Sequence, residues 1–129
     1  MDIGNESTFM AGTNLAAGAA RGSETCGALT GLLMALGIVS GRKRIDDVDA
    51  YQTSMRLAME AREIFLKQVG NTICADIQKS LLGRSFKMSD DKEREMFHNA
   101  GGHTREKCPG VCGKAAAIAG EVIFREGLY

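Results

Sequence analysis

Four cysteines have the most distinctive chemistry in this chain, and three of them occupy related positions. Cys26, Cys74 and Cys108 each lie at or next to the start of a predicted helix. A thiol there lies beside unpaired backbone N–H groups and the positive end of the helix dipole, so we expect it to ionise more easily. Thiolates bind soft metals and exchange disulfides or electrons. These residues predict a thiol site, with Cys112 as its fourth sulfur.

The spacing of the cysteines matches no standard metal motif. There is no C-x-x-C, which argues against zinc ribbons and thioredoxin-like motifs, and no C-x-x-C-H for covalent haem. Cys108 and Cys112 are four residues apart on one helix face, where a disulfide would be strained and shared metal ligation is easier. His98 and His103 lie just upstream, and a Cys₂His₂ zinc site with the two cysteines is an alternative.

A different class of function is also compatible with these residues. Free cysteine is among the residue types most often buried, so the chain is alternatively a non-redox interaction or structural module with core or zinc-binding cysteines. A hydrolase is less favoured, because no Ser-His-Asp, paired-carboxylate or H-E-x-x-H arrangement is recognisable. The glycine-containing segment 18–23 lacks the lysine and spacing of a phosphate-binding P-loop.

Length and charge narrow the remaining classes of fold and function. The 129 residues are enough for one domain with a real core. Sixteen basic and sixteen acidic residues balance, which disfavours nucleic acid as a partner. The N-terminus lacks the basic start and apolar run of a secretory signal, so we expect a cytoplasmic protein whose thiols are mostly reduced.

The central element is an apolar helix over residues 26–39. Its only polar side chain after the cysteine is Thr30, so we expect burial on nearly every face, with Ser23 or Thr25 as the N-cap. A length of about 20 Å is short of the roughly 30 Å needed to span a bilayer. Gly27 and Gly31 permit close approach of another helix and are candidate cofactor contacts.

Abundant Ala, Met and Leu, a single Pro and no Trp favour an all-α fold. We predict a single-domain bundle of about five helices around the central one. Residues 1–8 are expected to be disordered, and residues 9–127 to form the domain. Besides the central helix we expect a short helix over residues 9–20, interrupted by Gly12 and Gly18, and helices over 46–69 and 72–82. A further helix is capped by Ser89 and ends at residue 100, and the last helix has Cys108 as its cap and Pro109 at its first position.

The segment Cys26-Gly27-Ala28-Leu29-Thr30-Gly31 resembles the CGAxxG motif of a family of small redox-active proteins from bacteria and archaea, the C_GCAxxG_C_C family. Cys74, and Cys108 followed by Pro109, match the later cysteines of that family. The resemblance extends over residues 9–124. It implies an all-helical domain whose cysteines are redox-active or bind an iron–sulfur centre.

One feature departs from the family pattern. The family's first cysteine lies on a helix upstream of the motif, and no cysteine precedes Cys26 in this chain. Either the chain starts late and lacks that helix, or Cys112 is the fourth thiol. Whether this chain has the family's four-cysteine site depends on which of these two explanations is correct.

We therefore expect a cysteine-based redox protein in which Cys26, Cys74, Cys108 and Cys112 are the functional sulfurs. They either ligate an iron–sulfur cluster for electron transfer, which is slightly favoured, or act in thiol–disulfide exchange. The expected partner is another redox protein. Membrane insertion is not expected, and the glycine-rich helix faces leave a homodimer open.

Overall fold

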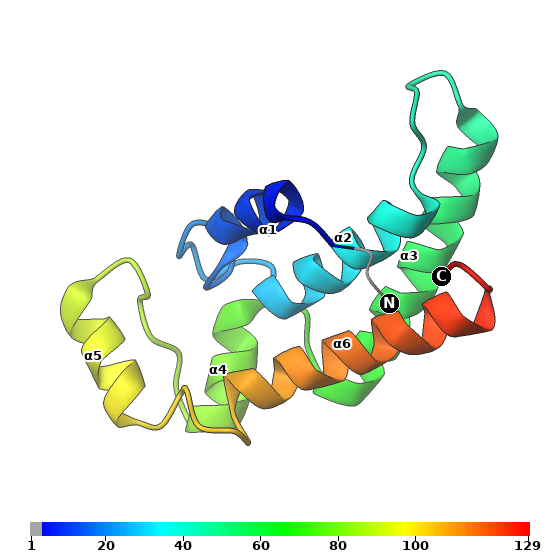
Figure 1. Cartoon of the computed structure of the whole chain (residues 1–129). Helices are drawn as coiled ribbons and strands as arrows, with labels where there is room; N and C mark the ends of the chain where they lie inside the picture. The colour runs from blue at the N-terminus through cyan, green and yellow to red at the C-terminus, as the bar shows by residue number, and fades with distance from the viewer. Residues whose placement is uncertain (1–3) are drawn as a thin grey trace.

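The computed structural model describes residues 4–129 of the chain (Figure 1). These residues contain six α-helices and one short 3₁₀ helix. These are α1 (Glu6–Gly12), η1 (Thr13–Leu15), α2 (Gly27–Ser40), α3 (Val48–Val69), α4 (Cys74–Leu82), α5 (Asp91–Asn99) and α6 (Cys108–Arg125). Within these residues the only β-type pairing is an isolated bridge between Thr25 and Ile73. The predicted all-α fold is confirmed.

Helices α2, α3 and α6 pack against one another and form the main core. Each contributes apolar residues three or four positions apart, which lie on one helix face. Burial of each large apolar side chain stabilises the fold by about 1.5–3 kcal/mol. The buried residues are Leu29, Leu32 and Leu36 of α2, Leu57, Ala61 and Phe65 of α3, and Val111, Ala115, Ile118, Ala119, Val122 and Ile123 of α6. Figure 1 shows α2 and α6 running in the same direction, so that their first turns lie at the same end of the core, near α4.

Helix α2 lies within one residue of its predicted bounds but is buried on one side only. Leu32 and Leu36 are almost fully buried, whereas Gly31 and Gly37 are exposed and Ile38 is 44% exposed. The prediction of burial on nearly every face is wrong, because α3 and α6 cover one side of α2 and only the short N-terminal segment lies over the other (Figure 1). The predicted cap is also wrong: Cys26 is the N-cap residue, and its side chain makes no capping bond.

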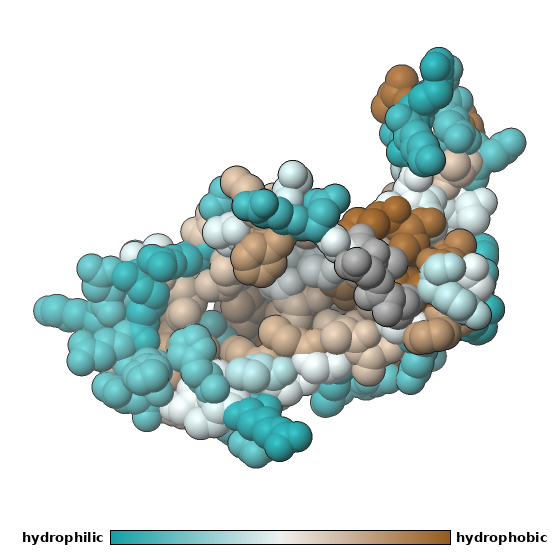
Figure 2. Space-filling view, in the orientation of Figure 1, coloured by the Kyte–Doolittle hydropathy of each residue, from teal (hydrophilic) through white to brown (hydrophobic). Residues whose placement is uncertain are grey.

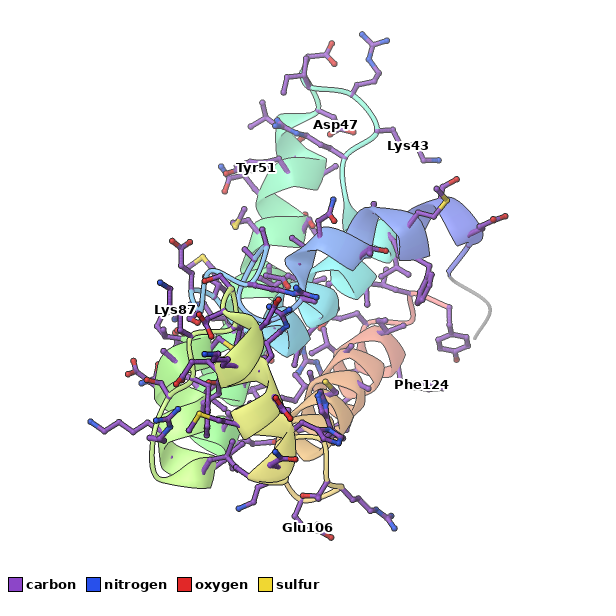
Figure 3. All side chains as sticks on the ribbon, turned by 90° about the vertical axis from the view of Figure 1, so that its left-hand side faces the viewer. Lys43, Asp47, Tyr51, Lys87, Glu106 and Phe124 are labelled. Atoms are coloured by element: carbon purple, nitrogen blue, oxygen red, sulfur yellow. The ribbon has the colours of Figure 1, made fainter. Side chains whose placement is uncertain are left out.

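Helix α3 begins at Val48, two residues after the predicted start. The Asp47 carboxylate caps it by accepting a hydrogen bond from the Ala50 N–H. Phe65, in its C-terminal half, is fully buried, as expected for the amphipathic face. Tyr51 and Met55, in its N-terminal half, are more than a third exposed. They are exposed because the first turns of α3, with the preceding loop, project beyond the bundle; Figure 3 shows Lys43, Asp47 and Tyr51 on this projection.

Helices α4 and α5 enclose a second, smaller core of Phe86, Met88 and Phe97. The rings of Phe86 and Phe97 meet edge to face, with centroids 5.7 Å apart. Helix α5 is capped by Asp90, whose carboxylate accepts hydrogen bonds from two backbone N–H groups, and not by the predicted Ser89. This small core packs against Leu82 at the end of α4 and Cys108 at the start of α6.

The N-terminal segment differs most from its prediction. We expected disorder over residues 1–8 and a helix over 9–20. Residues 1–3 lie outside the described part, but α1 already begins at Glu6, with the Asn5 side chain accepting from the Thr8 N–H. Helix α1 ends at Gly12 and η1 at Leu15, and an irregular loop follows. Among the described residues, no helix has both the length and the apolar character needed to cross a membrane.

Candidate functional site

All four cysteines line one cavity of about 450 Å³ at the end of the core where the helix starts meet. All four are free thiols. Figure 2 shows a hollow between α1 and α6, with largely apolar residues around it and hydrophilic residues over α5. Apart from the thiols, the lining is mostly apolar and includes Met34, Ile77, Met88, Phe97 and Val111. The structure thus brings the four predicted site residues to a single apolar space.

Cys26 and Cys74 are held together by antiparallel backbone pairing at the starts of α2 and α4. The Cys26 N–H donates to the Thr72 carbonyl at 2.9 Å, and the Cys74 N–H donates to the Glu24 carbonyl at 2.6 Å. These two bonds flank the bridge between Thr25 and Ile73. Both cysteines are buried, with 9% of Cys26 and 8% of Cys74 exposed. Two helix starts that are 48 positions apart in the sequence, 26 and 74, are therefore fixed side by side.

The loop before Cys26 crosses directly over Cys74. It contains a run of residues with positive φ, Ala17, Gly18, Ala19, Ala20 and Arg21, followed by Ser23. A Cβ atom at Gly18 would lie 2.8 Å from Cys74 Cβ and 2.5 Å from the Glu24 backbone nitrogen. Only glycine fits there without displacing the backbone. The helix predicted over 9–20 is wrong beyond Leu15, where this left-handed loop takes its place. Left-handed conformations cost L-residues roughly 1–2 kcal/mol each, so contacts with the surrounding structure must hold the loop.

Cys108 and Cys112 lie one turn apart on α6. Cys108 is the first helical residue and half-buried, Pro109 follows it, and the N-cap is Lys107, not the predicted Cys108. The Lys107 ammonium donates to the Leu81 carbonyl at 2.6 Å, which ties the start of α6 to the end of α4. Cys112 is exposed yet lines the cavity, so the space opens to solvent beside it.

The two candidate glycines differ in their surroundings. A Cβ at Gly27 would lie 3.0 Å from the Leu15 carbonyl oxygen, so Gly27 permits close approach of the η1 backbone and not of a second long helix. Gly31 has no atom within 4 Å of a Cβ position and is exposed at the cavity. Gly31 therefore leaves the space above α2 open.

Burial and neighbouring sulfurs raise the pKa values of Cys74, Cys108 and Cys112. Burial, then the nearby sulfurs of Cys26 and Cys108, raise the pKa of Cys74 to about 11, while a hydrogen bond from Gln78 lowers it. Burial followed by repulsion from Cys26 and Cys112 raises the pKa of Cys108. Burial and Cys26 likewise raise the pKa of Cys112. The expectation of easier ionisation at a helix start is wrong for Cys74 and Cys108, because an apolar cavity shared by several sulfurs disfavours negative charge.

The histidines do not complete a zinc site. His103 lines the cavity and lies edge-on to Phe97, with ring centroids 5.1 Å apart. His98 lies beside His103, with ring centroids 5.7 Å apart, and both histidines are exposed. Over residues 4–129, no three His, Cys, Asp or Glu side chains form a group able to hold one metal ion. An iron–sulfur cluster is ligated by four thiolates on two or more iron atoms, so its ligands need not converge on a single ion. In number and type the four thiols fit such a cluster.

One residue of the site was missed by the sequence interpretation. Gln78 lies one turn after Cys74 on the inner face of α4 and is 2% exposed. Its amide contacts Cys74 Sγ. The signal was a polar residue at i+4 from a cysteine, next to the buried Ile77, within an otherwise amphipathic pattern.

The chain matches one family model over residues 1–122, described as "Putative redox-active protein (C_GCAxxG_C_C)". Residues 26–31 read C-G-A-L-T-G, so cysteine precedes glycine here, whereas in the family's G-C-A-x-x-G motif glycine precedes cysteine. No curated protein and no solved structure matches the chain. Because the family model covers nearly the whole chain, the protein belongs to the C_GCAxxG_C_C family.

Proposed function

We propose that the four cysteines hold an iron–sulfur centre and that the protein transfers single electrons to and from a redox partner. The observation that carries this proposal is the convergence of every cysteine in the chain, from α2, α4 and α6, on one apolar cavity. Four thiolates are the usual ligand set of such clusters, which supply one-electron reduction and oxidation when bound.

The acidity of the thiols supports metal binding over free-thiol chemistry. At neutral pH the raised pKa values keep Cys74, Cys108 and Cys112 mostly protonated, which makes them weak nucleophiles. A bound cation reverses this preference, because it neutralises the repulsion among the sulfurs and displaces their protons. Metal binding should therefore release protons and become tighter as pH rises.

The surroundings of the sulfurs suit electron transfer. Backbone pairing holds Cys26 and Cys74, and the Lys107–Leu81 bond holds the helix start that carries Cys108. The lining is mostly apolar and Cys26 and Cys74 are buried, and burial of this kind is one of the factors that set a cluster's reduction potential. Cys112, at the open side, would be the ligand nearest to a docking partner.

Thiol–disulfide exchange is the second candidate, and the exposure of Cys112 favours it. In that reaction the Cys112 thiolate attacks one sulfur of a partner's disulfide and releases the other as a thiolate. Cys108, one turn away, then attacks the Cys112 sulfur, which leaves a Cys108–Cys112 disulfide and a fully reduced partner. The raised pKa of both thiols and the strain of a disulfide within one helical turn weigh against this route.

Anaerobic purification tests the proposal. We expect visible absorbance with stoichiometric iron and sulfide, and each single Cys→Ser variant should lose most of the bound iron. Met34→Leu is the matched control, because Met34 lines the same cavity with a sulfur that is not a thiol. It should retain iron and colour.

Three results would contradict the iron–sulfur proposal. Colourless protein that stays metal-free after anaerobic reconstitution would refute it. Zinc in place of iron would support the structural alternative. A mixed disulfide trapped at Cys112 in a Cys108→Ser variant of metal-free protein, found by mass spectrometry, would support thiol exchange.

A further inference from the structure

Gln78 is the one polar or charged residue that is fully buried among the described residues, at 2% exposure. It belongs to α4, whose first residue is Cys74. A buried amide costs stability unless its polar atoms are hydrogen-bonded, so its partners show what it does there.

Both ends of the Gln78 side chain have partners. Its Oε1 accepts a hydrogen bond from the Phe86 backbone N–H at 2.9 Å, across the turn that leads from α4 toward α5. Its Nε2 donates to Cys74 Sγ at 3.7 Å, an ordinary length for a bond to sulfur. The Phe86 bond fixes the orientation of the amide, because a flipped amide would place its NH₂ against another N–H donor. The N–H donor is therefore aimed at the sulfur by a second, independent contact.

We propose that Gln78 is a positioning residue of the thiol site, whose amide is oriented by Phe86 and donates an N–H···S hydrogen bond that favours negative charge on the Cys74 sulfur. The effect on a bound redox centre rests on the proposed function, but the hydrogen bond itself does not. Hydrogen bonds to cysteine sulfur are among the factors that set the potential of iron–sulfur centres. Since reduction adds negative charge, a donor at this sulfur makes reduction easier.

Two variants remove the donor in different ways. Gln78→Glu keeps an oxygen for the Phe86 N–H and replaces the N–H donor by a carboxylate, and Gln78→Met keeps the length of the side chain without either polar group. We expect both to lower the equilibrium constant for one-electron reduction of the reconstituted protein by about tenfold, which is a 59 mV shift to more negative midpoint potential. Gln52→Glu, the same change at an exposed position of α3, should leave the potential unchanged. Unchanged potentials in both Gln78 variants would overturn the proposal.

Metal-free protein tests the hydrogen bond separately. In wild type we expect the Gln78 Nε2 protons to exchange with solvent at least tenfold more slowly by NMR than those of the exposed Gln52 and Gln68. In a Cys74→Ala variant that remains folded, this protection should fall. Equal exchange rates in wild type would overturn the assignment of Gln78. Failure of wild type to bind iron would instead contradict the proposed function, while the exchange measurement still decides the role of Gln78.

Discussion

Replacing Gly18 by alanine should break the loop that holds Cys74. Gly18 has φ +79°, and a Cβ there would lie 2.5 Å from the Glu24 nitrogen and 2.8 Å from Cys74 Cβ. The left-handed conformation costs alanine roughly 1–2 kcal/mol. Relief of the overlap requires backbone displacement, which costs a further 1–3 kcal/mol or so. We expect Gly18→Ala to lower the free energy of unfolding by about 2–5 kcal/mol.

Urea denaturation with matched thermal melts measures this loss. For a chain of this size 1 kcal/mol corresponds to a change in Tm of about 4 °C, so the expected fall in Tm is about 8–20 °C. Gly37→Ala is the control, because Gly37 lies in α2 with nothing within 4 Å of a Cβ position. That substitution should stabilise the protein by about 0.5–1 kcal/mol. A loss below about 1 kcal/mol for Gly18→Ala would refute the close crossing of loop and Cys74.

Two further predictions concern the same region. Because the folded-state pKa of Cys74 is raised to about 11 from an ordinary value near 9, its contribution to stability is complete below pH 9. It should be lost between about pH 9 and 11, so that metal-free wild type loses about 1–2 kcal/mol more than Cys74→Ser after allowance for solvent screening; the raised pKa values of Cys108 and Cys112 contribute to the loss in both proteins. Ala19 has φ +58°, so Ala19→Gly should stabilise the fold by up to about 1 kcal/mol in urea denaturation, and a destabilised variant would contradict the left-handed loop.

Local signals were enough to predict most of the helices and their ends. Gly70 and Gly83 end α3 and α4 in the left-handed conformation, as glycine at a helix C-terminus favours. Acidic residues mark the starts of α3 and α5, although the N-cap of α5 is Asp90, one position after the predicted Ser89. These signals work because a helix end is satisfied by residues within one turn of it.

The chemistry of the candidate site depended on contacts that no local pattern contains. The cysteines at helix starts were visible in the sequence, but the direction of the pKa shift of Cys74 and Cys108 was predicted wrongly, because burial is a property of the packed core. Gln78 was overlooked because its partners are Cys74 and the Phe86 backbone, which only the packing of α4 brings to it.

The sequence by itself determined an all-helical chain with cysteines at the starts of α2, α4 and α6, since helix propensity and capping act over a few residues. The tertiary structure decided that these starts share one end of the core and one cavity. It also decided that a left-handed loop, built largely of alanine, crosses Cys74 and that one face of α2 stays open. These features depend on long-range backbone pairing and on which surfaces are covered, and both are set by the arrangement of whole helices.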